Sequence, residues 1–325
     1  MVGQITMSNG LSKGPYGIFG LPGPGAWCQF FPKGKFCCHE RGPYIVLGKK
    51  TMEELQKILA TYAYNILGSM EDARDVVQDA MERYLVLDRS RIEDRRNYLI
   101  KAVINRAINL KKRKHYVSTY GKWLPEPVEL QTAESPLIRE QTASYSLLVL
   151  MERLSPLERA VFILKEGFGY RHREIAEVLD IQTEYSRQLF LRAGKSLQRP
   201  NPTPKEPSPV LLEAFVQAIT GGDLETLETL LLEDVELTAD GGGTVRVVSG
   251  SSLGARDTAQ LLHYVHGRFL RLDGHFLTQV NHQPALVFHR GGQIHNCQIL
   301  AYGGPGIAKL YSIVDPQKLH SIKIR

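Results

Sequence analysis

Residues 170–197 read YRHREIAEVLDIQTEYSRQLFLRAGKSL, and this stretch predicts two short helices joined by a tight turn. Apolar side chains within residues 175–179 fall on one face of the first helix, as an amphipathic helix requires. Aspartate tolerates the left-handed backbone conformation that such a turn needs, so we expect the turn at Asp180 and a cap at Gln182 or Thr183. Two short helices followed by a basic tail are typical of a helix-turn-helix that reads DNA.

The outward face of the second helix carries side chains that suit nucleic acid. Arginine pairs with guanine edges, glutamine with adenine edges, and lysine with phosphates. An ordinary surface helix more often mixes both charges, but a helical hairpin of an all-α domain is the alternative that this stretch alone leaves open. We predict that the face contacts duplex DNA through Thr183, Glu184, Arg187, Gln188, Arg192 and Lys195.

Length and charge indicate several domains with different partners. A chain of 325 residues is long for one domain and sufficient for two or three, each with its own core. The net charge of +6 is uneven: residues 51–200 carry 24 Lys and Arg against 21 Asp and Glu, whereas residues 206–325 carry 9 against 12. Within the basic part, residues 101–122 hold seven basic side chains and no acidic one, which favours a polyanionic partner.

The sequence has no pattern typical of a membrane or secreted protein. No apolar run approaches the roughly 20 residues of a membrane span, and the first residues lack a basic start followed by an apolar core. We therefore expect a soluble, cytoplasmic protein with no membrane contact. We also expect free thiols and no metal site, because CxxC spacing is absent among Cys28, Cys37, Cys38 and Cys297.

Changes in periodicity and composition divide the chain into segments. Glycine and proline dominate the start of the chain, helical periodicity follows in two blocks, and a proline-rich stretch precedes a segment of mixed character. We expect a flexible extension at 1–50, a helical domain at 51–116, a linker at 117–143, a second helical domain at 144–200, a spacer at 201–209 and a further domain at 210–325.

Finer patterns predict the elements inside these segments. In the first helical domain we expect helices at about 51–67, 71–87 and 94–115, and in the second at 145–154 and 156–166, with Ser155 as a cap. In the last domain we expect helices at 210–220, 224–232 and 255–270, and strands at 235–239, 245–248, 276–280, 285–289, 298–302 and 307–314. Helices followed by an antiparallel sheet describe an α+β domain.

Three stretches of the helical part, taken together, resemble a bacterial sigma factor of the extracytoplasmic-function (ECF) type. LGSMEDARDVVQDAMERYL at 67–85 is similar to the family's helix that docks on the clamp of RNA polymerase, with Arg74 where the family usually has an acid. YLIKAVINRAINLKKRKH at 98–115 is similar to the helix that melts and reads the minus 10 promoter element. RLSPLERAVFILKEGFGYRHREIAEVLDI at 153–181 resembles the start of the fourth conserved region, which implies that the helix-turn-helix reads the minus 35 element.

The resemblance implies two functional surfaces in the first helical domain. The polymerase contact falls on Asp75, Val76, Gln78 and Asp79. Opening a promoter also needs polar and cationic groups that face single-stranded bases and their backbone. These groups are Asn105, Arg106, Asn109, Lys111, Lys112 and Arg113.

Three shorter motifs resemble signatures of the ECF sigma factors that carry a fused SnoaL-like domain. They are the linker motif WLPEP at 123–127, the glycine turn DGGGT at 240–244 and the tail motif DPQKL at 315–319. The fold implied is multidomain: two all-α sigma domains, a three-helix module and a helix-turn-helix module, plus a C-terminal α+β SnoaL-like cone. We expect an intramolecular contact in which the acidic C-terminal domain regulates the sigma domains through Trp123, Pro125, Asp240, Gly241, Gly242, Gly243, Asp315, Pro316 and Lys318.

The chemistry expected is binding rather than catalysis. Seven histidines are scattered over residues 206–325, and although His266 with Asp240 could act as acid and base, no tight constellation is evident. We expect core RNA polymerase and promoter DNA as partners, with no enzyme activity, no cofactor and no metal. A ligand-responsive helix-turn-helix regulator and an enzyme of the SnoaL-like polyketide-cyclase type stay open as alternatives, as does an unidentified small-molecule ligand of the cone.

Overall fold

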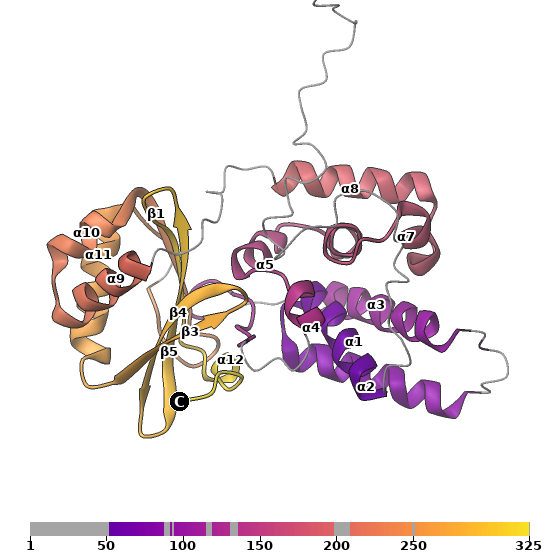
Figure 1. Ribbon diagram of the computed structural model, residues 1–325, viewed down its shortest axis with the longest axis horizontal. Helices are drawn as coiled ribbons and strands as arrows, with labels where there is room; N and C mark the ends of the chain where they lie inside the picture. Colours follow the sequence, from indigo (N-terminus) through magenta and orange to yellow (C-terminus); the bar gives the residue numbers. More distant parts are fainter. Residues whose placement is uncertain are drawn as a thin grey trace, which may run out of the picture.

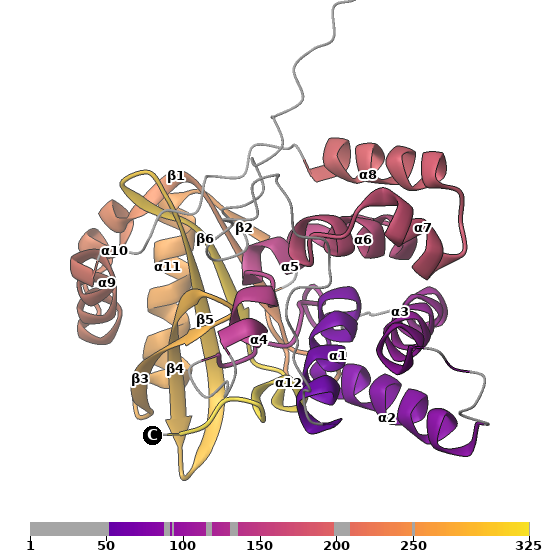
Figure 2. The same ribbon diagram turned by 45° about the vertical axis from the view of Figure 1, so that its right-hand side comes forward.

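The computed structural model of the chain describes residues 52–87, 92, 94–114, 119–130, 136–197, 209–248 and 251–324. The expected extension at 1–50, with three of the cysteines, and the spacer up to residue 208 lie outside the described residues. Two groups of helices lie beside a twisted sheet that carries further helices of its own (Figures 1 and 2).

The first group of helices consists of α1 (Met52–Leu67), α2 (Met70–Val86) and α3 (Arg95–Arg113). Gly68 ends α1 with a left-handed φ of 79°, and Ser69 then caps α2 by accepting a hydrogen bond from the Asp72 N–H at 3.2 Å. Asp94 caps α3 in the same way. The three predicted helices are therefore confirmed, with ends that differ by one or two residues.

The second group consists of α4 (Pro136–Gln141), α5 (Tyr145–Met151), α6 (Pro156–Phe162), the π-helical turn η3 (Ile163–Gly167), α7 (His172–Leu179) and α8 (Thr183–Leu197). Ser155 caps α6 in a reciprocal capping box with Glu158, as expected. Asp180 has φ 55° and ψ 52°, so it supplies the predicted left-handed turn between α7 and α8. The sequence does not predict α4, because Pro136 indicates a linker there. In the structure Pro136 occupies the first turn of a helix, where proline is tolerated.

One hydrophobic core joins the two groups of helices. It contains buried side chains from α1, α2, α3 and α5–α8. Tyr62 of α1 stacks on Phe168 with ring centroids 3.6 Å apart, and its hydroxyl oxygen lies 3.2 Å from that of Tyr170. Because burial of one leucine or phenylalanine contributes about 1.5–3 kcal/mol, this shared core holds α1–α3 against α5–α8.

The C-terminal part forms one mixed sheet with helices. Its elements are α9 (Pro209–Gly221), α10 (Leu224–Leu230), β1 (Leu231–Asp240), β2 (Ser251–Leu253), α11 (Ala255–Val265), the π-helical turn η4 (His266–Leu270), β3 (Gly274–Val280), β4 (Gln283–Arg290), β5 (Gln293–Gly303), β6 (Gly306–Ile313) and α12 (Pro316–Leu319). The strand order is β2-β1-β6-β5-β4-β3. β1 runs parallel to β6 and every other neighbouring pair is antiparallel, so the α+β class is confirmed but the expectation of a wholly antiparallel sheet is wrong.

Two predictions at the start of this sheet are also wrong. Residues 245–248 form a loop rather than a strand, with Val245 and Val248 37% and 50% exposed, and they pair with none of the described strands. β1 begins at Leu231, where the helical pattern runs on to residue 232. Leu231 pairs with Ile307 of β6 and so belongs to the strand. The sequence leaves this open, because a leucine-rich run fits both the helical and the strand period.

The two faces of the sheet pack against different parts of the chain. Leu300 and Tyr302 of β5 point into a core with α9, α10 and α11, which cover one face in Figure 1. Ile299 and Ala301 point to the other face. That face packs on Leu124 of the linker motif and on α5, so the sheet lies between its own helices and the amino-terminal helices.

Candidate functional site

The predicted duplex-reading face of α8 is open to solvent. Thr183 is its first residue, and Leu189, Ala193 and Leu197 anchor the opposite face in the core. The predicted DNA contacts from Glu184 onward are exposed: Glu184, Arg187, Gln188, Arg192 and Lys195. Arg187 pairs with Glu184 one turn earlier, but an exposed pair of this kind contributes little, so a guanine edge or phosphate can replace the carboxylate.

The predicted strand-opening face of α3 is partly covered by the second group of helices. The Asn105 side-chain amide donates one hydrogen bond to the Lys101 carbonyl oxygen at 2.9 Å and another to the Val178 carbonyl oxygen of α7 at 3.0 Å. An asparagine amide has two hydrogens, so both are used. Figures 1 and 2 show α7 directly beside α3.

Several cations of this face have acidic partners within the protein. Arg106 pairs with Asp79 of α2, and Lys114 donates to both carboxylate oxygens of Asp72 at 2.8 and 2.9 Å. The remaining predicted contacts at the end of α3 are exposed: Asn109, Lys112 and Arg113. The basic face is thus divided into an exposed part and a part engaged by the protein itself.

A buried charge cluster of Lys111, Glu152 and Arg159 lies where the two groups of helices meet. Lys111 donates to the Glu152 carboxylate at 2.9 and 3.0 Å and to the Leu67 carbonyl oxygen at 3.0 Å, and Arg159 binds the same carboxylate. Burial lowers the pKa of Lys111, with Arg159 adding to the effect, whereas these two cations together hold the pKa of Glu152 below its ordinary value despite its own burial. The cluster links the two groups, because Lys111 belongs to the first and Glu152 and Arg159 to the second; removing one partner would leave an uncompensated buried charge, at a cost of about 3–5 kcal/mol.

The predicted polymerase contacts divide between the surface and the core of α2. Asp75, Gln78 and Asp79 are exposed, whereas Val76 is 5% exposed and packs in the hydrophobic core. Burial excludes Val76 from a direct surface contact, because its place in the helical period lies one position off the exposed stripe. The predicted surface therefore reduces to its polar members.

The three predicted regulatory motifs meet at one point. Asp240 of the glycine turn is fully buried and accepts a hydrogen bond from the Leu124 N–H at 2.7 Å. Lys318 of the tail motif pairs with the same carboxylate and donates to the Leu124 carbonyl oxygen at 2.7 Å. The indole of Trp123 lies beside this contact, with its centroid 4.5 Å from Lys318 Nζ.

Two of the three glycines of the turn lie too close to neighbouring atoms to carry a side chain. A Cβ on Gly242, whose φ is 60°, would lie 2.4 Å from the Asp315 carboxyl group, and a Cβ on Gly241 would lie 1.8 Å from a backbone oxygen of Val245. Gly243, by contrast, has nothing within 4 Å of such a Cβ.

The remaining motif residues have structural roles of their own. Asp315 caps α12 with Pro316 in its first turn, and the Pro125 carbonyl oxygen accepts a hydrogen bond from the Tyr145 hydroxyl at 2.7 Å.

A fourth contact point, the turn between β3 and β4, is missed by the sequence reasoning. Asn281 is fully buried with a left-handed φ of 46°. Its amide donates to the Tyr64 hydroxyl oxygen of α1 at 2.9 Å and to the Ala143 carbonyl oxygen at 3.3 Å, and its side-chain oxygen accepts from the Val128 N–H at 2.8 Å. The signal available was an asparagine between two predicted strands, which indicates a tight hairpin but no partner for it.

Residues next to Asn281 extend this contact toward α5. Gln283 accepts a hydrogen bond from the Ser146 N–H at 2.6 Å, and the His282 ring nitrogen Nε2 lies 3.0 Å from the Thr142 carbonyl oxygen, so it must donate. Burial holds the pKa of His282 below its ordinary value. The turn therefore contacts α1, the linker and the start of α5 at once.

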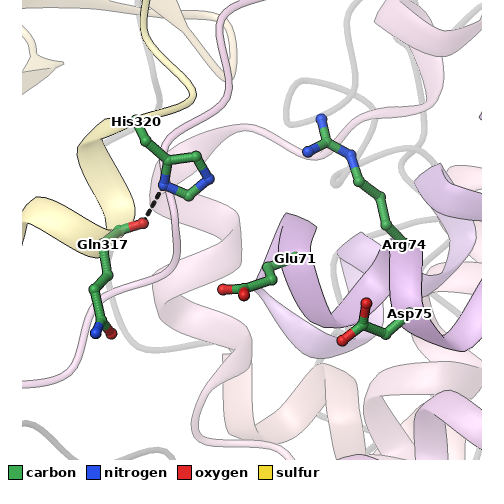
Figure 3. Close-up of a pocket in the computed structure, with 5 residues that line it drawn as sticks. All are labelled: Glu71, Arg74, Asp75, Gln317 and His320. Carbon is green, nitrogen blue, oxygen red and sulfur yellow. Dashed lines mark hydrogen bonds between the residues drawn. The ribbon is translucent and has the colours of Figure 1, made fainter.

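An open cavity of about 390 Å³ separates α2 from the tail motif (Figure 3). Glu71, Arg74 and Asp75 line it from α2, and Gln317 and His320 line it from the α12 side. One predicted polymerase contact, Asp75, therefore lies across an open cavity from the C-terminal domain. The exposed polar stripe of α2 is accessible in this arrangement.

The acid–base pair considered from the sequence is not formed. The Asp240 carboxylate is bound by Leu124, Gly242 and Lys318. His266 instead packs against Phe288, with ring centroids 5.8 Å apart, and burial lowers its pKa. The cone thus presents no pairing of these two groups.

The described residues include neither a cluster of metal-binding side chains nor a membrane-spanning helix. Its histidine, cysteine and acidic side chains nowhere gather in a group of three able to hold a metal ion. Its helices include none long and apolar enough to span a bilayer. Cys297 is a buried thiol whose pKa is raised by that burial.

Comparison with known proteins agrees with this geometry. Residues 51–116 match the sigma-70 region 2 family and residues 144–193 match sigma-70 region 4. The ECF RNA polymerase sigma factor SigJ of Mycobacterium tuberculosis is 36% identical over 213 residues, which cover 61% of this chain and 68% of the relative. The chain belongs to the ECF sigma factors. A second relative from that organism, the probable ECF RNA polymerase sigma factor SigI, is 26% identical over 274 residues, covering 82% of this chain and 92% of the relative.

The structural comparison extends the family to the C-terminal domain. The crystal structure of SigJ matches with a TM-score of 0.67 at 26% identity, covering 84% of this chain and 98% of that one. The expected fold, two helical sigma domains with a SnoaL-like C-terminal domain, is therefore confirmed. As an ECF sigma factor, the protein binds core RNA polymerase and directs promoter-dependent initiation of transcription. The roles of single side chains in α2, α3 and α8 stay predictions.

Proposed function

We propose that the fused C-terminal domain holds this ECF sigma factor in a closed arrangement that restricts its access to promoter DNA. The bond from Asn105 to Val178 carries the proposal. Asn105 is predicted to bond to minus 10 bases, yet region four takes its amide in this arrangement. Region four must therefore move away from α3 before the minus 10 element is read.

The contacts of the C-terminal domain explain how region two and region four are kept together. The side-chain amide of Asn281 donates both to Tyr64 in region two and to Ala143, beside α5 of region four. The glycine turn and tail motif hold the linker motif between them through Asp240 and Lys318. A domain with contacts on both regions and on their linker sets the distance between the two promoter-binding helices.

In the open form, two separate helices bind the two promoter elements. α8 reads the minus 35 element as duplex through its exposed face, and α3 binds the opened minus 10 element through Asn105, Arg106 and Asn109. α2 docks on core polymerase through its exposed polar stripe. Polymerase and promoter stabilise the open form by their higher affinity for it, since a ligand shifts an equilibrium only by its differential affinity.

Substitution of Asn281 by glycine tests the proposal. Asn281→Gly keeps the left-handed backbone and removes the three side-chain hydrogen bonds of Asn281. Each such bond contributes about 0.5–1.5 kcal/mol, so the ratio of closed to open form falls roughly tenfold or more. We expect promoter-dependent transcription with limiting sigma factor and core polymerase to rise by a similar factor. Glu228→Ala, at an exposed position of α10, is the matched control.

A chain ending at residue 205 reaches the open form by a second route. Its transcription should also exceed that of the full chain, and unchanged output from both variants would refute regulation by the C-terminal domain. A gel-shift with promoter DNA alone discriminates the alternative of a ligand-responsive regulator. That class binds DNA tightly without polymerase, whereas this sigma factor should need core enzyme.

A further inference from the structure

One aromatic ring of the linker motif contacts cations from two different domains. The Trp123 ring centroid lies 5.1 Å from Lys111 Nζ of α3 and 4.5 Å from Lys318 Nζ of the tail motif. A cation near the face of an indole within about 6 Å is attracted by the negative charge of the ring face. Trp123 therefore interacts with a residue predicted to bind DNA and with a residue of the C-terminal domain.

Each of the two cations also has its own carboxylate. Lys111 is held by Glu152 of region four, and its side chain is only 8% exposed. Lys318 is held by Asp240, whose side chain is fully buried. Two ion pairs from different domain contacts thus meet at one ring, and a change on one side alters the environment of the other.

The position of the ring is tightly defined. Gly68, at the end of α1, lies so close that a Cβ there would be 3.0 Å from Trp123 Cη2. The same Cβ would lie 3.5 Å from Glu152 Oε1 and from Arg159 Nη2, so the ring sits directly over the buried charge cluster. Leu124, the next residue, is fixed by Asp240 and Lys318 through its backbone N–H and carbonyl groups.

We propose that Trp123 is a positioning residue through which the tail motif keeps Lys111 in the buried charge cluster and away from DNA. This inference rests on the proposed function of the C-terminal domain and names the DNA-binding group that it withholds. When the tail motif leaves, Lys318 no longer holds the ring, the ring withdraws from Lys111, and water reaches the Lys111–Glu152 pair. Lys111 then exchanges the Glu152 carboxylate for a phosphate.

The neighbours of Lys111 make the effect measurable. Lys112 and Arg113 are exposed in the closed form, so their contacts with DNA do not depend on Trp123. Lys111 should add one phosphate contact on opening. The slope of log binding constant against log salt concentration changes by about 0.7–0.9 for each phosphate neutralised, so one contact is resolvable.

The test measures binding of a single-stranded oligonucleotide to the full chain across a salt series, without core polymerase, so that the unsubstituted protein stays in the closed form. We expect Trp123→Ala to steepen the salt slope by about one phosphate contact, and Trp123→Phe, which keeps an aromatic face, to keep the slope near that of the unsubstituted protein. Lys111→Met removes the phosphate contact itself, so it should abolish the increase in the Trp123→Ala background. A rescue by phenylalanine and a loss by Lys111→Met are outcomes that general loosening of the fold does not produce.

A second pair of variants approaches the ring from the tail motif and guards against misfolding of Trp123→Ala. Lys318→Met combined with Asp240→Asn removes the cation without leaving a buried carboxylate unpaired, and it should steepen the slope as Trp123→Ala does; Glu228→Ala, at an exposed position of α10, is the control. An unchanged slope in Trp123→Ala and in the double variant overturns the role of Trp123. If Asn281→Gly still raises transcription, regulation by the C-terminal domain stands without that role. If Asn281→Gly also has no effect, both proposals are refuted.

Discussion

The side-chain amide of Asn281 lies 2.9 Å from the hydroxyl oxygen of Tyr64, so a hairpin turn of the C-terminal domain reaches the first helix of region two. Tyr64 in turn donates to the Glu126 carbonyl oxygen of the linker motif at 2.7 Å. The side chains of Asn281 and Tyr64 are fully buried. Three segments far apart in the sequence therefore share one hydrogen-bonded chain, and a change at the turn is felt in region two and in the linker.

Gly242→Ala should separate the tail motif from the glycine turn. The added methyl group would overlap the Asp315 carboxyl group, and alanine is strained at a φ of 60°. The two effects together cost about 2–5 kcal/mol, so the thermal unfolding midpoint should fall and transcription should rise.

Gly243→Ala is the matched control for that substitution. It lies one residue along the same turn and its Cβ would meet nothing within 4 Å. Equal effects of the two substitutions on stability and transcription would show that the tail contact does not restrain the protein.

Adjacent residues of α2 should have opposite phenotypes. Asp75→Lys reverses an exposed charge on the predicted polymerase surface, so it should weaken binding to core polymerase and leave stability within about 0.5 kcal/mol. Val76→Ala removes buried methyl groups, so it should lower the free energy of unfolding by about 1–3 kcal/mol. Binding titrations and denaturant unfolding of both variants check this; normal polymerase binding by Asp75→Lys would remove Asp75 from the docking surface.

Acid should weaken the contact made by the β3–β4 turn. Burial is the main cause that holds the pKa of His282 below 6.5; the Arg139 guanidinium adds to it, while hydrogen bonds to the Thr142 and Arg139 backbone oppose it. The closed form thus binds fewer protons there than an open form. Its contribution is complete above about pH 6.5 and is lost as pH falls from there through the lowered pKa.

A comparison of two variants isolates this effect from other groups. Glu126, whose pKa burial raises, titrates in the opposite direction, so the informative quantity is the difference between the unsubstituted protein and His282→Asn. Asparagine tolerates the left-handed backbone of residue 282. The fall in the thermal unfolding midpoint between about pH 7.5 and pH 5.5 should be smaller for His282→Asn than for the unsubstituted protein. An equal fall in the two proteins would exclude His282 as the group responsible.

Local signals in the sequence predict the helical part well. Asp180 is found in the left-handed turn that its side chain suits, and Ser155 caps α6, because caps and turns depend on a few neighbouring residues. The same locality explains the errors: the parallel pairing of β1 with β6 and the loop at 245–248 depend on partners many residues away.

The regulatory contacts were predictable only in part. The motifs around Trp123, Asp240 and Lys318 could be paired through the resemblance to a family. The contacts of Asn281 could not, because a buried turn residue and an exposed one have the same local sequence signal. The hydrogen bond from Asn105 to Val178 was also not predictable from the sequence, since it depends on how two helical groups far apart in the sequence pack on each other.

The separation of α3 from α8 tests the closed arrangement most directly. Fluorescent labels at Asn97 of α3 and Ser196 of α8, both exposed and outside the predicted DNA contacts, report this separation by energy transfer in the full chain. High transfer efficiency in the protein alone is predicted, with a fall in Asn281→Gly and a further fall when core polymerase and promoter DNA bind. Equal efficiency in the protein alone, in the variant and in the promoter complex would contradict a closed form held by the C-terminal domain.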